Sequence, residues 1–258
     1  MLLSGEMPGA PSVEAPSRGA QRVLSMGWYA PVKAAGDFLF AVVLLVLTAP
    51  LMLLAMALVR LTSRGPVVYS QTRLGKNGRP FTIYKLRTMI HECESLTGAC
   101  WSVPGDKRIT PVGRWLRRTH LEELPQLWNV IRGDMSLIGP RPERPEFVPN
   151  LERAIPHYRR RLFVRPGVTG LAQVQLPPDT DLASVRIKLA YDLYYVRVVN
   201  PWLDFRILWA TFFKMIGVSF VTIRGLLGFP ARETIEHAYT AMGPGDVPGR
   251  IVALPVTS

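Results

Sequence analysis

The chain has little cysteine. Its 258 residues contain two cysteines, Cys93 and Cys100, and no second pair that would build a disulfide framework or a zinc site. We therefore expect reduced thiols in a reducing compartment. The G-x-x-x-x-G-K-S/T phosphate loop and any internal repeat are also missing. These absences argue against a disulfide-rich secreted protein, a zinc module, a repeat array and a P-loop phosphotransferase.

Negative charge is scarce too. Asp and Glu number 19 against 31 Lys and Arg, which gives a formal net charge of +12. Such a balance predicts a partner that carries phosphate, such as a nucleic acid, an anionic lipid or a nucleotide. Arginine outnumbers lysine, and its planar guanidinium favours forked contacts to phosphate.

The two ends of the chain lack a regular apolar pattern. Residues 1–28 are rich in Gly, Pro, Ser and Ala, and we predict a disordered leader there. They have no short apolar core followed by a small-residue cleavage site, so a secretory signal is not expected. Residues 221–258 are treated as a C-terminal tail, to which the sequence assigns no function.

A long apolar run follows the leader. Residues 38–59 read FLFAVVLLVLTAPLMLLAMALV and contain no charge. As a helix this run would extend about 33 Å, enough to cross a hydrocarbon core of about 30 Å. Pro50, near its centre, removes a backbone hydrogen bond and favours a break. Thr48 can bond a carbonyl that the break frees.

Basic residues stand on both sides of the run. By the positive-inside rule, they place both of its ends in the cytoplasm. A helix-break-helix that dips into one leaflet and returns explains both the charge and Pro50, and a kinked span is an equal alternative. Asp37 follows Lys33 by four residues, so the two can pair. The flanking basic residues are Arg18, Arg22 and Lys33 before the run, and Arg60, Arg64, Arg73, Lys76 and Arg79 after it.

The chain beyond the apolar run predicts a mixed α/β fold, mainly short helices with a small β-hairpin. The hairpin spans residues 65–89 around the turn Lys76-Asn77-Gly78. Helical apolar spacing covers residues 114–132, with a break or kink at Pro125 and an end at Gly133.

Three further segments complete the expected architecture. Residues 139–145, GPRPERP, suit neither a helix nor a central strand, so we expect a loop. Residues 181–200 predict a second helix. Residues 201–220 predict an amphipathic helix at the membrane interface, with Trp202 and Trp209 either as membrane anchors or, equally, as core residues.

Two adjacent carboxylates, Glu122 and Glu123, stand among arginines. One interpretation is structural: Thr119 and Glu122 fit a capping box, and Glu123 pairs with a nearby arginine. The other is chemical, because the arginines attract phosphate and keep a carboxylate ionised by lowering its pKa. These arginines are Arg114, Arg117 and Arg118 before the pair, and Arg132, Arg141 and Arg144 after it.

A carboxylate among phosphate-binding groups suits phosphoryl transfer through an acyl phosphate. One carboxylate attacks phosphorus, while a second holds Mg²⁺, which neutralises the leaving diphosphate. Adjacent residues on a helix point in different directions, which suits two different roles.

Several stretches together resemble one protein family. They are KAAGD before the apolar run, QTRLGKNGRPFTIYKLRTM, RITPVGRWLRRTHLEELPQLWNVIRGDMSLIGPRPERPEF, VRPGVTGLAQV and KLAYDLYYV, which together cover roughly residues 33–215. The chain resembles the bacterial monotopic phosphoglycosyl transferases, also called polyprenyl-phosphate sugar-1-phosphate transferases or bacterial sugar transferases. The combination of ELPQLWNV with RGDMSLIGPRP is highly specific for that family.

The resemblance implies a topology and a location. It favours a re-entrant membrane hairpin over residues 29–62 with its break at Pro50. A catalytic domain with interfacial helices, residues 63–220, would follow on the cytoplasmic face of the bacterial inner membrane.

The resemblance also implies an activity. A sugar-1-phosphate would pass from a nucleotide diphospho-sugar, usually a UDP-sugar, to undecaprenyl phosphate with release of UMP. The product would start a surface glycoconjugate or an exopolysaccharide. Mg²⁺ is the implied cofactor, the membrane bilayer is an expected partner, and nucleic acid is not. The sequence leaves the sugar and the oligomeric state open, a homodimer included.

Roles for individual residues follow from the same resemblance. Glu122 is the expected nucleophile, which forms a covalent phospho-sugar, and Glu123 is the expected Mg²⁺ ligand. The expected substrate-binding residues, each with a structural role as its alternative, are Lys85, Arg87, Arg117, Arg118, Arg141, Arg165 and Asp192.

Two positions depart from the family pattern. Glu122 stands where the family usually has Asp; its side chain is one methylene longer but equivalent as a nucleophile. Ala49-Pro50 stands where the family usually has Ser-Pro, so a hydroxyl that could satisfy freed backbone groups is lost.

Two other functions fit parts of the sequence. A membrane-anchored adaptor could bind anionic lipid or nucleic acid through its basic face, but such a protein needs no buried acidic pair. An unrelated Mg²⁺-dependent phosphotransferase is not supported by any phosphate loop.

Overall fold

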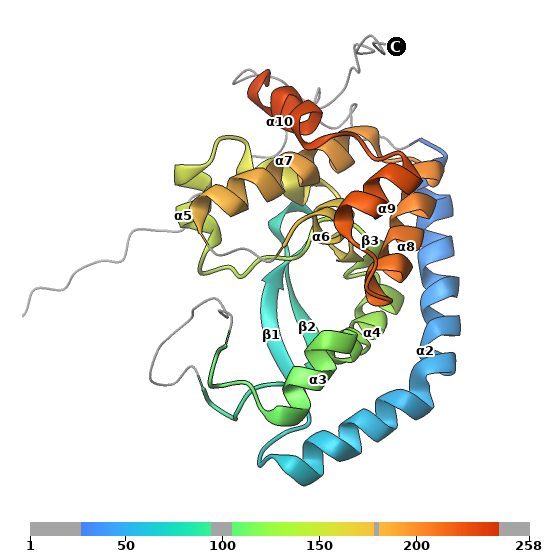
Figure 1. The fold of residues 1–258 in the computed structure, drawn as a ribbon, viewed down its shortest axis with the longest axis vertical. Coiled ribbons are helices and arrows are strands. Elements are labelled where there is room, and N and C mark those ends of the chain that lie inside the picture. Colours follow the sequence, from blue (N-terminus) through green and yellow to red (C-terminus); the bar gives the residue numbers. More distant parts are fainter. Residues whose placement is uncertain (1–26, 94–104, 178–180, 243–258) are drawn as a thin grey trace, which may run out of the picture.

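The computed structural model describes residues 27–93, 105–177 and 181–242. Nearly all of the predicted leader, Cys100, and residues 243–258 of the predicted tail lie outside these ranges. Figure 1 shows a mixed α/β arrangement that is mostly helical, with the long helix α2 along one side and beneath the rest. The predicted fold class is confirmed at this level.

The apolar run forms one helix, α2 (Tyr29–Thr62), which is bent and not broken. Figure 1 shows it descending along one side and then turning beneath α3 and α4. Pro50 lies inside it and has no N–H to give the carbonyl of Val46, four residues earlier. The Thr48 hydroxyl donates to the Leu44 carbonyl (2.7 Å), a bond that itself favours bending. The expected rescue of a freed carbonyl by Thr48 is therefore wrong.

The surface of α2 is apolar and largely exposed. It is the one helix in the described ranges that is long and apolar enough to cross a membrane, and only 11% of its most apolar window is buried. An exposed apolar surface of this extent is stable against lipid, which supports membrane association. Large exposed side chains on it include Phe38, Leu39, Phe40, Val43, Val46, Leu47, Leu53 and Leu54.

The predicted hairpin is present. Strands β1 (Val68–Leu74) and β2 (Pro80–Leu86) pair antiparallel around the turn η1 (Lys76–Gly78). Because side chains alternate along a strand, Leu86 packs against the C-terminal half of α2 while Lys85 points to the other face. The hairpin thus separates the membrane helix from the site described below.

Residues 114–132 form two helices, as predicted. Helix α3 (Pro111–Thr119) ends at His120, and α4 (Gln126–Ile131) begins after Pro125. The 3₁₀ turn η2 (Leu121–Glu123) lies between them and carries both glutamates. Gly133, with φ 78°, follows the end of α4.

A second pair of strands holds the GPRPERP loop. Strands β3 (Ser136–Ile138) and β4 (Gly167–Thr169) are parallel, and the predicted loop follows β3. Gly139 and Gly167 allow the two neighbouring segments of backbone to approach closely, because a Cβ on either glycine would overlap the backbone of the other segment. Helix α5 (Val148–Ala154) and η3 (Tyr158–Phe163) complete the connection.

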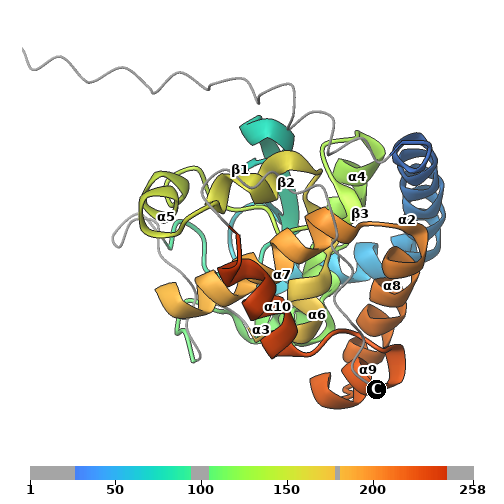
Figure 2. The same cartoon turned by 90° about the horizontal axis from the view of Figure 1, so that it is seen from above.

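The C-terminal helices cover the core. Helix α7 (Leu182–Val198) is the predicted second helix, and its neighbours are α6 (Leu171–Gln175), α8 (Pro201–Met215), α9 (Phe220–Leu227) and α10 (Arg232–Thr240). Figure 2 shows α10 lying across α7. Ile223 of α9 and Ile235 of α10 are buried in the core, so this part of the expected tail belongs to the folded domain.

Helix α8 has two different faces. Leu203, Ile207 and Ala210 are buried, whereas Trp202 and Trp209 are 64% and 44% exposed. Phe205 and Phe212 continue the exposed face, and neighbouring rings are in contact. Core packing of the two tryptophans is therefore wrong, and their role as membrane anchors stays a prediction.

Polar contacts fasten α2 to α8, which lies beside its N-terminal half in Figures 1 and 2. Lys33 contacts Asp204 at 2.7 Å and Asp37 at 3.5 Å, so the expected Lys33–Asp37 pair is confirmed. The hydroxyls of three residues also donate to these carboxylates at 2.6–2.8 Å. We call this the anchor cluster: Tyr29, Lys33, Asp37, Ser136, Tyr195 and Asp204.

Candidate active site

The two glutamates lie on a sharp turn. His120 has φ 56°, a left-handed conformation that is uncommon for a residue other than glycine. It reverses the chain between α3 and η2. The Thr119 hydroxyl donates to the carbonyls of Trp115 and Leu116, so the capping box with Glu122 is not formed. Strained backbone of this kind concentrates at functional sites.

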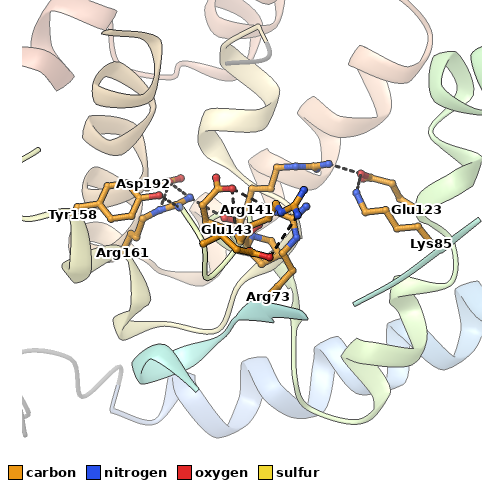
Figure 3. A network of polar contacts seen from close by, with 11 residues as sticks. Arg73, Lys85, Glu123, Arg141, Glu143, Tyr158, Arg161 and Asp192 are labelled. Carbon is orange, nitrogen blue, oxygen red and sulfur yellow. Dashed lines mark hydrogen bonds and ion pairs between the residues drawn. The ribbon is translucent and has the colours of Figure 1, made fainter. Parts of the chain in front are cut away.

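Glu123 is held between two cations. Lys85 Nζ lies 3.1 Å and Arg141 Nη2 lies 2.7 Å from the same oxygen, Oε1. Figure 3 shows both side chains meeting at the Glu123 carboxylate. Burial alone would raise the pKa of the Glu123 carboxyl, but the charges and hydrogen bonds of Arg141 and Lys85 together hold that pKa well below its usual range. Glu123 is a carboxylate at neutral pH.

Glu122 is in a different state. Its side chain is buried, and its Oε2 has no hydrogen-bond partner among the described residues. Burial raises the pKa of Glu122 to about 7, and the negative charge of Glu123 adds to the rise. The expectation that nearby arginines lower the pKa of a carboxylate therefore holds for Glu123 and not for Glu122, where burial and the charge of Glu123 outweigh the cations.

Arg117 supplies positive charge on the Glu122 side. Its guanidinium interacts electrostatically with Glu122, and its Nε donates to the hydroxyl of Thr88 at 2.9 Å. Gly113 makes this contact possible, because a Cβ there would overlap the Thr88 carbonyl and push α3 away from the loop after β2. The turn η2 therefore has the guanidinium of Arg117, fixed by Thr88, on the side of Glu122.

A buried ion pair between Arg161 and Asp192 holds the backbone of Arg141 in place. Arg161 Nη2 donates to the Arg141 carbonyl at 2.8 Å and to Asp192 Oδ2 at 2.7 Å, and both charged groups are almost fully buried. Figure 3 traces this line of contacts from Tyr158 through Arg161 and Arg141 to Glu123. Asp192, expected to bind substrate, is thus a buried partner of Arg161 and supports the loop that carries Arg141.

The remaining predicted residues are spread out. Arg87 is buried and donates to the Ser63 carbonyl and hydroxyl at 2.8 and 2.7 Å, so it holds the C-terminal end of α2. Arg118 is exposed on α3, and Arg165 is exposed in the loop before β4. The structure brings together Lys85, Arg117 and Arg141 around the glutamates.

Two titratable side chains near the site, Lys214 and His120, were missed by sequence reasoning. Lys214 of α8 donates to the Gln173 carbonyl at 2.6 Å and interacts electrostatically with Glu123 and Arg141. His120 interacts with the same group of charges, and burial lowers its pKa. Lys214 lies 91 residues after Glu123, so no local pattern could have revealed it.

The site offers few protein ligands for a metal. Among the described residues, no group of three or more His, Cys, Asp or Glu side chains could hold an ion. Mg²⁺ in phosphate chemistry needs only one or two carboxylates, since waters and substrate phosphates complete its shell. The Glu123 carboxylate fits the role of such a single protein ligand, because it is ionised and lies among cations that attract phosphate.

Comparison with known proteins identifies the family. Residues 28–218 match the family described as bacterial sugar transferase, and the chain belongs to that family. The match contains α2, the hairpin, the turn with both glutamates and helices α7 and α8.

Individual relatives carry related names. A UDP-N-acetylgalactosamine-undecaprenyl-phosphate N-acetylgalactosaminephosphotransferase from Aeromonas hydrophila is 44% identical over 79% of this chain and 46% of its own length. A UDP-glucose:undecaprenyl-phosphate glucose-1-phosphate transferase from Xanthomonas campestris is 38% identical over 74% of this chain and 40% of its own. An exopolysaccharide production protein, PSS, from Rhizobium leguminosarum is 40% identical over 70% of this chain and 92% of its own. The chain thus spans about half the length of several relatives.

Proposed function

We propose that this protein transfers a sugar-1-phosphate from a UDP-sugar to undecaprenyl phosphate and releases UMP. The observation that carries the proposal is a buried carboxylate oxygen, Glu122 Oε2, without a hydrogen-bond partner among the described residues, close to the three cationic side chains of Lys85, Arg117 and Arg141. An unsatisfied buried oxygen is costly unless a ligand or a reaction uses it. The names of the relatives supply the substrate classes.

The first step forms a covalent intermediate. Glu122 Oε2 attacks the phosphorus that bears the sugar; the new bond joins Oε2 to phosphorus, and the bond between phosphorus and the bridging oxygen of UMP breaks. Lys85, Arg117 and Arg141 hold the diphosphate and stabilise the charge that develops on it. Burial of Glu122 keeps its carboxylate poorly solvated, which suits a nucleophile.

The second step returns the enzyme to its starting state. An oxygen of the lipid phosphate attacks the same phosphorus, and the bond to Oε2 breaks, so the sugar phosphate leaves on the lipid and Glu122 is a carboxylate again. Glu123 would hold Mg²⁺ together with the phosphates, and the ion, when bound, neutralises diphosphate charge. Without Mg²⁺, Glu123 fixes Lys85 and Arg141 in place.

We also propose that α2 is re-entrant and that the domain faces the cytoplasm at the bacterial inner membrane. The bend at Pro50, the basic residues on both flanks and the exposed aromatic face of α8 support this topology. Cysteines introduced at Val32 and at Thr62, in a chain without native cysteines, should both resist an impermeant reagent added outside intact cells. Labelling of one alone would indicate a true span.

The activity is tested by UMP release. Purified protein in lipid nanodiscs receives Mg²⁺, undecaprenyl phosphate and a panel that includes UDP-N-acetylgalactosamine and UDP-glucose. We expect multiple turnovers with at least one UDP-sugar, and turnover that depends on the lipid acceptor and is lost on chelation. Absence of turnover with every UDP-sugar contradicts the proposal, while preference within the panel identifies the sugar.

A further inference from the structure

An apolar groove of about 370 Å³ lies between α2 and the catalytic domain. Leu45, Met52 and Met56 of α2 form one wall. Their spacing of seven and four residues places them on one face of the helix, and they stand on both sides of Pro50. The groove therefore sits on the concave side of the bend, where α2 turns beneath the domain (Figure 1).

The opposite wall belongs to elements that also carry the active site. Tyr84 of β2 and Pro125 with Trp128 of the α4 region line it. Tyr84 directly precedes Lys85, and their side chains leave opposite faces of the strand. Pro125 follows Glu123 by two residues. The groove thus lies on the α2 face of the hairpin, and the cations and carboxylates lie on the other.

A ligand with an apolar chain and an anionic head matches this division. The groove is lined by hydrophobic and aromatic side chains, and one of its walls is the helix with the lipid-type surface. Two methionines give that wall an adaptable shape, which suits a long, branched hydrocarbon. Lys85, Arg117 and Arg141, which interact with the glutamates of the neighbouring turn η2, complement a phosphate head. A water-soluble nucleotide sugar has no apolar chain to place there.

We infer that this groove binds the isoprenoid chain of the polyprenyl-phosphate acceptor next to its phosphate, an inference that rests on the proposed function. The kink at Pro50 then does more than set the topology of α2. It opens the space between α2 and the hairpin that the isoprenoid chain occupies. The lipid reaches the groove sideways from the leaflet, and its phosphate reaches Glu122 around the η2–α4 turn.

Filling the groove tests the inference. Met52→Trp places bulk in the groove, and its matched control is Leu53→Trp, the next residue, whose side chain is 62% exposed on α2. We expect Met52→Trp to raise the acceptor KM at least tenfold over Leu53→Trp. The single-turnover burst of UMP from a UDP-sugar without acceptor should stay within twofold in both variants.

The outcomes separate the two proposals. No UMP from the unmodified protein defeats the proposed function. Normal turnover with equal acceptor KM values in the two tryptophan variants contradicts the inferred lipid groove and leaves the proposed function intact. A photoreactive polyprenyl phosphate provides a measurement on the unmodified chain: we expect crosslinks in the peptide that contains Met52 and Met56, competed by undecaprenyl phosphate. Crosslinks competed equally by an ordinary phospholipid would assign the groove to bulk lipid and overturn the inference.

Discussion

Two buried clusters of carboxylates and cations differ in how fully their polar atoms are satisfied. In the anchor cluster, Asp204 accepts from Lys33 and two tyrosines, and no fully buried side-chain N or O atom of the cluster lacks a hydrogen-bond partner among the described residues. At the active site, Glu123 is similarly paired, but Glu122 Oε2 is not. The comparison separates a cluster that holds two helices together from one that is prepared for a reaction.

The largest expected effect is on activity. Glu122→Gln keeps the size of the side chain but removes the nucleophile, so UMP release should fall at least about 1000-fold. Glu236→Gln, which alters an exposed ion pair on α10, is the control and should keep the activity of the unmodified protein. Turnover of the Glu122 variant within tenfold of normal would show that both clusters are structural.

The anchor cluster should respond in stability. Asp204→Asn removes the charge that Lys33 contacts at 2.7 Å and places an amide against two hydroxyls, which should cost roughly 3 kcal/mol. Denaturation in nanodiscs measures this loss, and Glu236→Gln should change stability by less than about 0.5 kcal/mol. A similarly small change in stability for Asp204→Asn would show that the anchor cluster does not hold α2 to α8.

The pH dependence of stability distinguishes the two clusters further. The pKa of Glu122 is raised from 4.5 to about 7, so the folded protein loses stability as pH rises through this window. Glu122→Gln removes that loss and should be more stable than the unmodified protein at pH 8, by an amount on the order of 3 kcal/mol. The difference should vanish below about pH 4.5, where the glutamate is protonated in both states. A variant less stable at pH 8 would contradict the raised pKa.

The smallest effect concerns the exposed face of α8. Trp209→Ala should weaken binding to vesicles only a few-fold, because α2 supplies most of the apolar surface. Leu182→Ala, which alters an equally exposed side chain at the start of α7, should leave vesicle binding unchanged. Equal vesicle binding by both variants would show that the exposed face of α8 does not contact the membrane.

Much of the fold was predictable because it depends on local patterns. The Asn77 turn and the end at Gly133 follow from backbone chemistry, and the structure has both. The first of the two predicted helices ends at His120 and not at Pro125, where the second begins, because His120 adopts a left-handed conformation that no local pattern predicts. The bend of α2 was expected as a break, because the sequence shows that Pro50 removes a hydrogen bond but not whether neighbouring turns tolerate the loss.

The site was predictable in part of its membership and not in its electrostatics. Lys85, Arg117 and Arg141 were expected, and all three surround the glutamates. Which glutamate they would neutralise depends on side-chain direction and burial, and a count of nearby arginines contains neither. For Asp192 the structure favours the structural alternative, and the sequence could not decide, because its partner Arg161 lies 31 residues away.

The most direct test of the account is to find the covalent intermediate. The protein is incubated with a UDP-sugar that carries a labelled sugar phosphate, without lipid acceptor, and its peptides are mapped by mass spectrometry. We predict a phospho-sugar on the Glu122 side chain that disappears when undecaprenyl phosphate is added. A label on Glu123 or elsewhere, or turnover with no labelled peptide, would contradict the central claim.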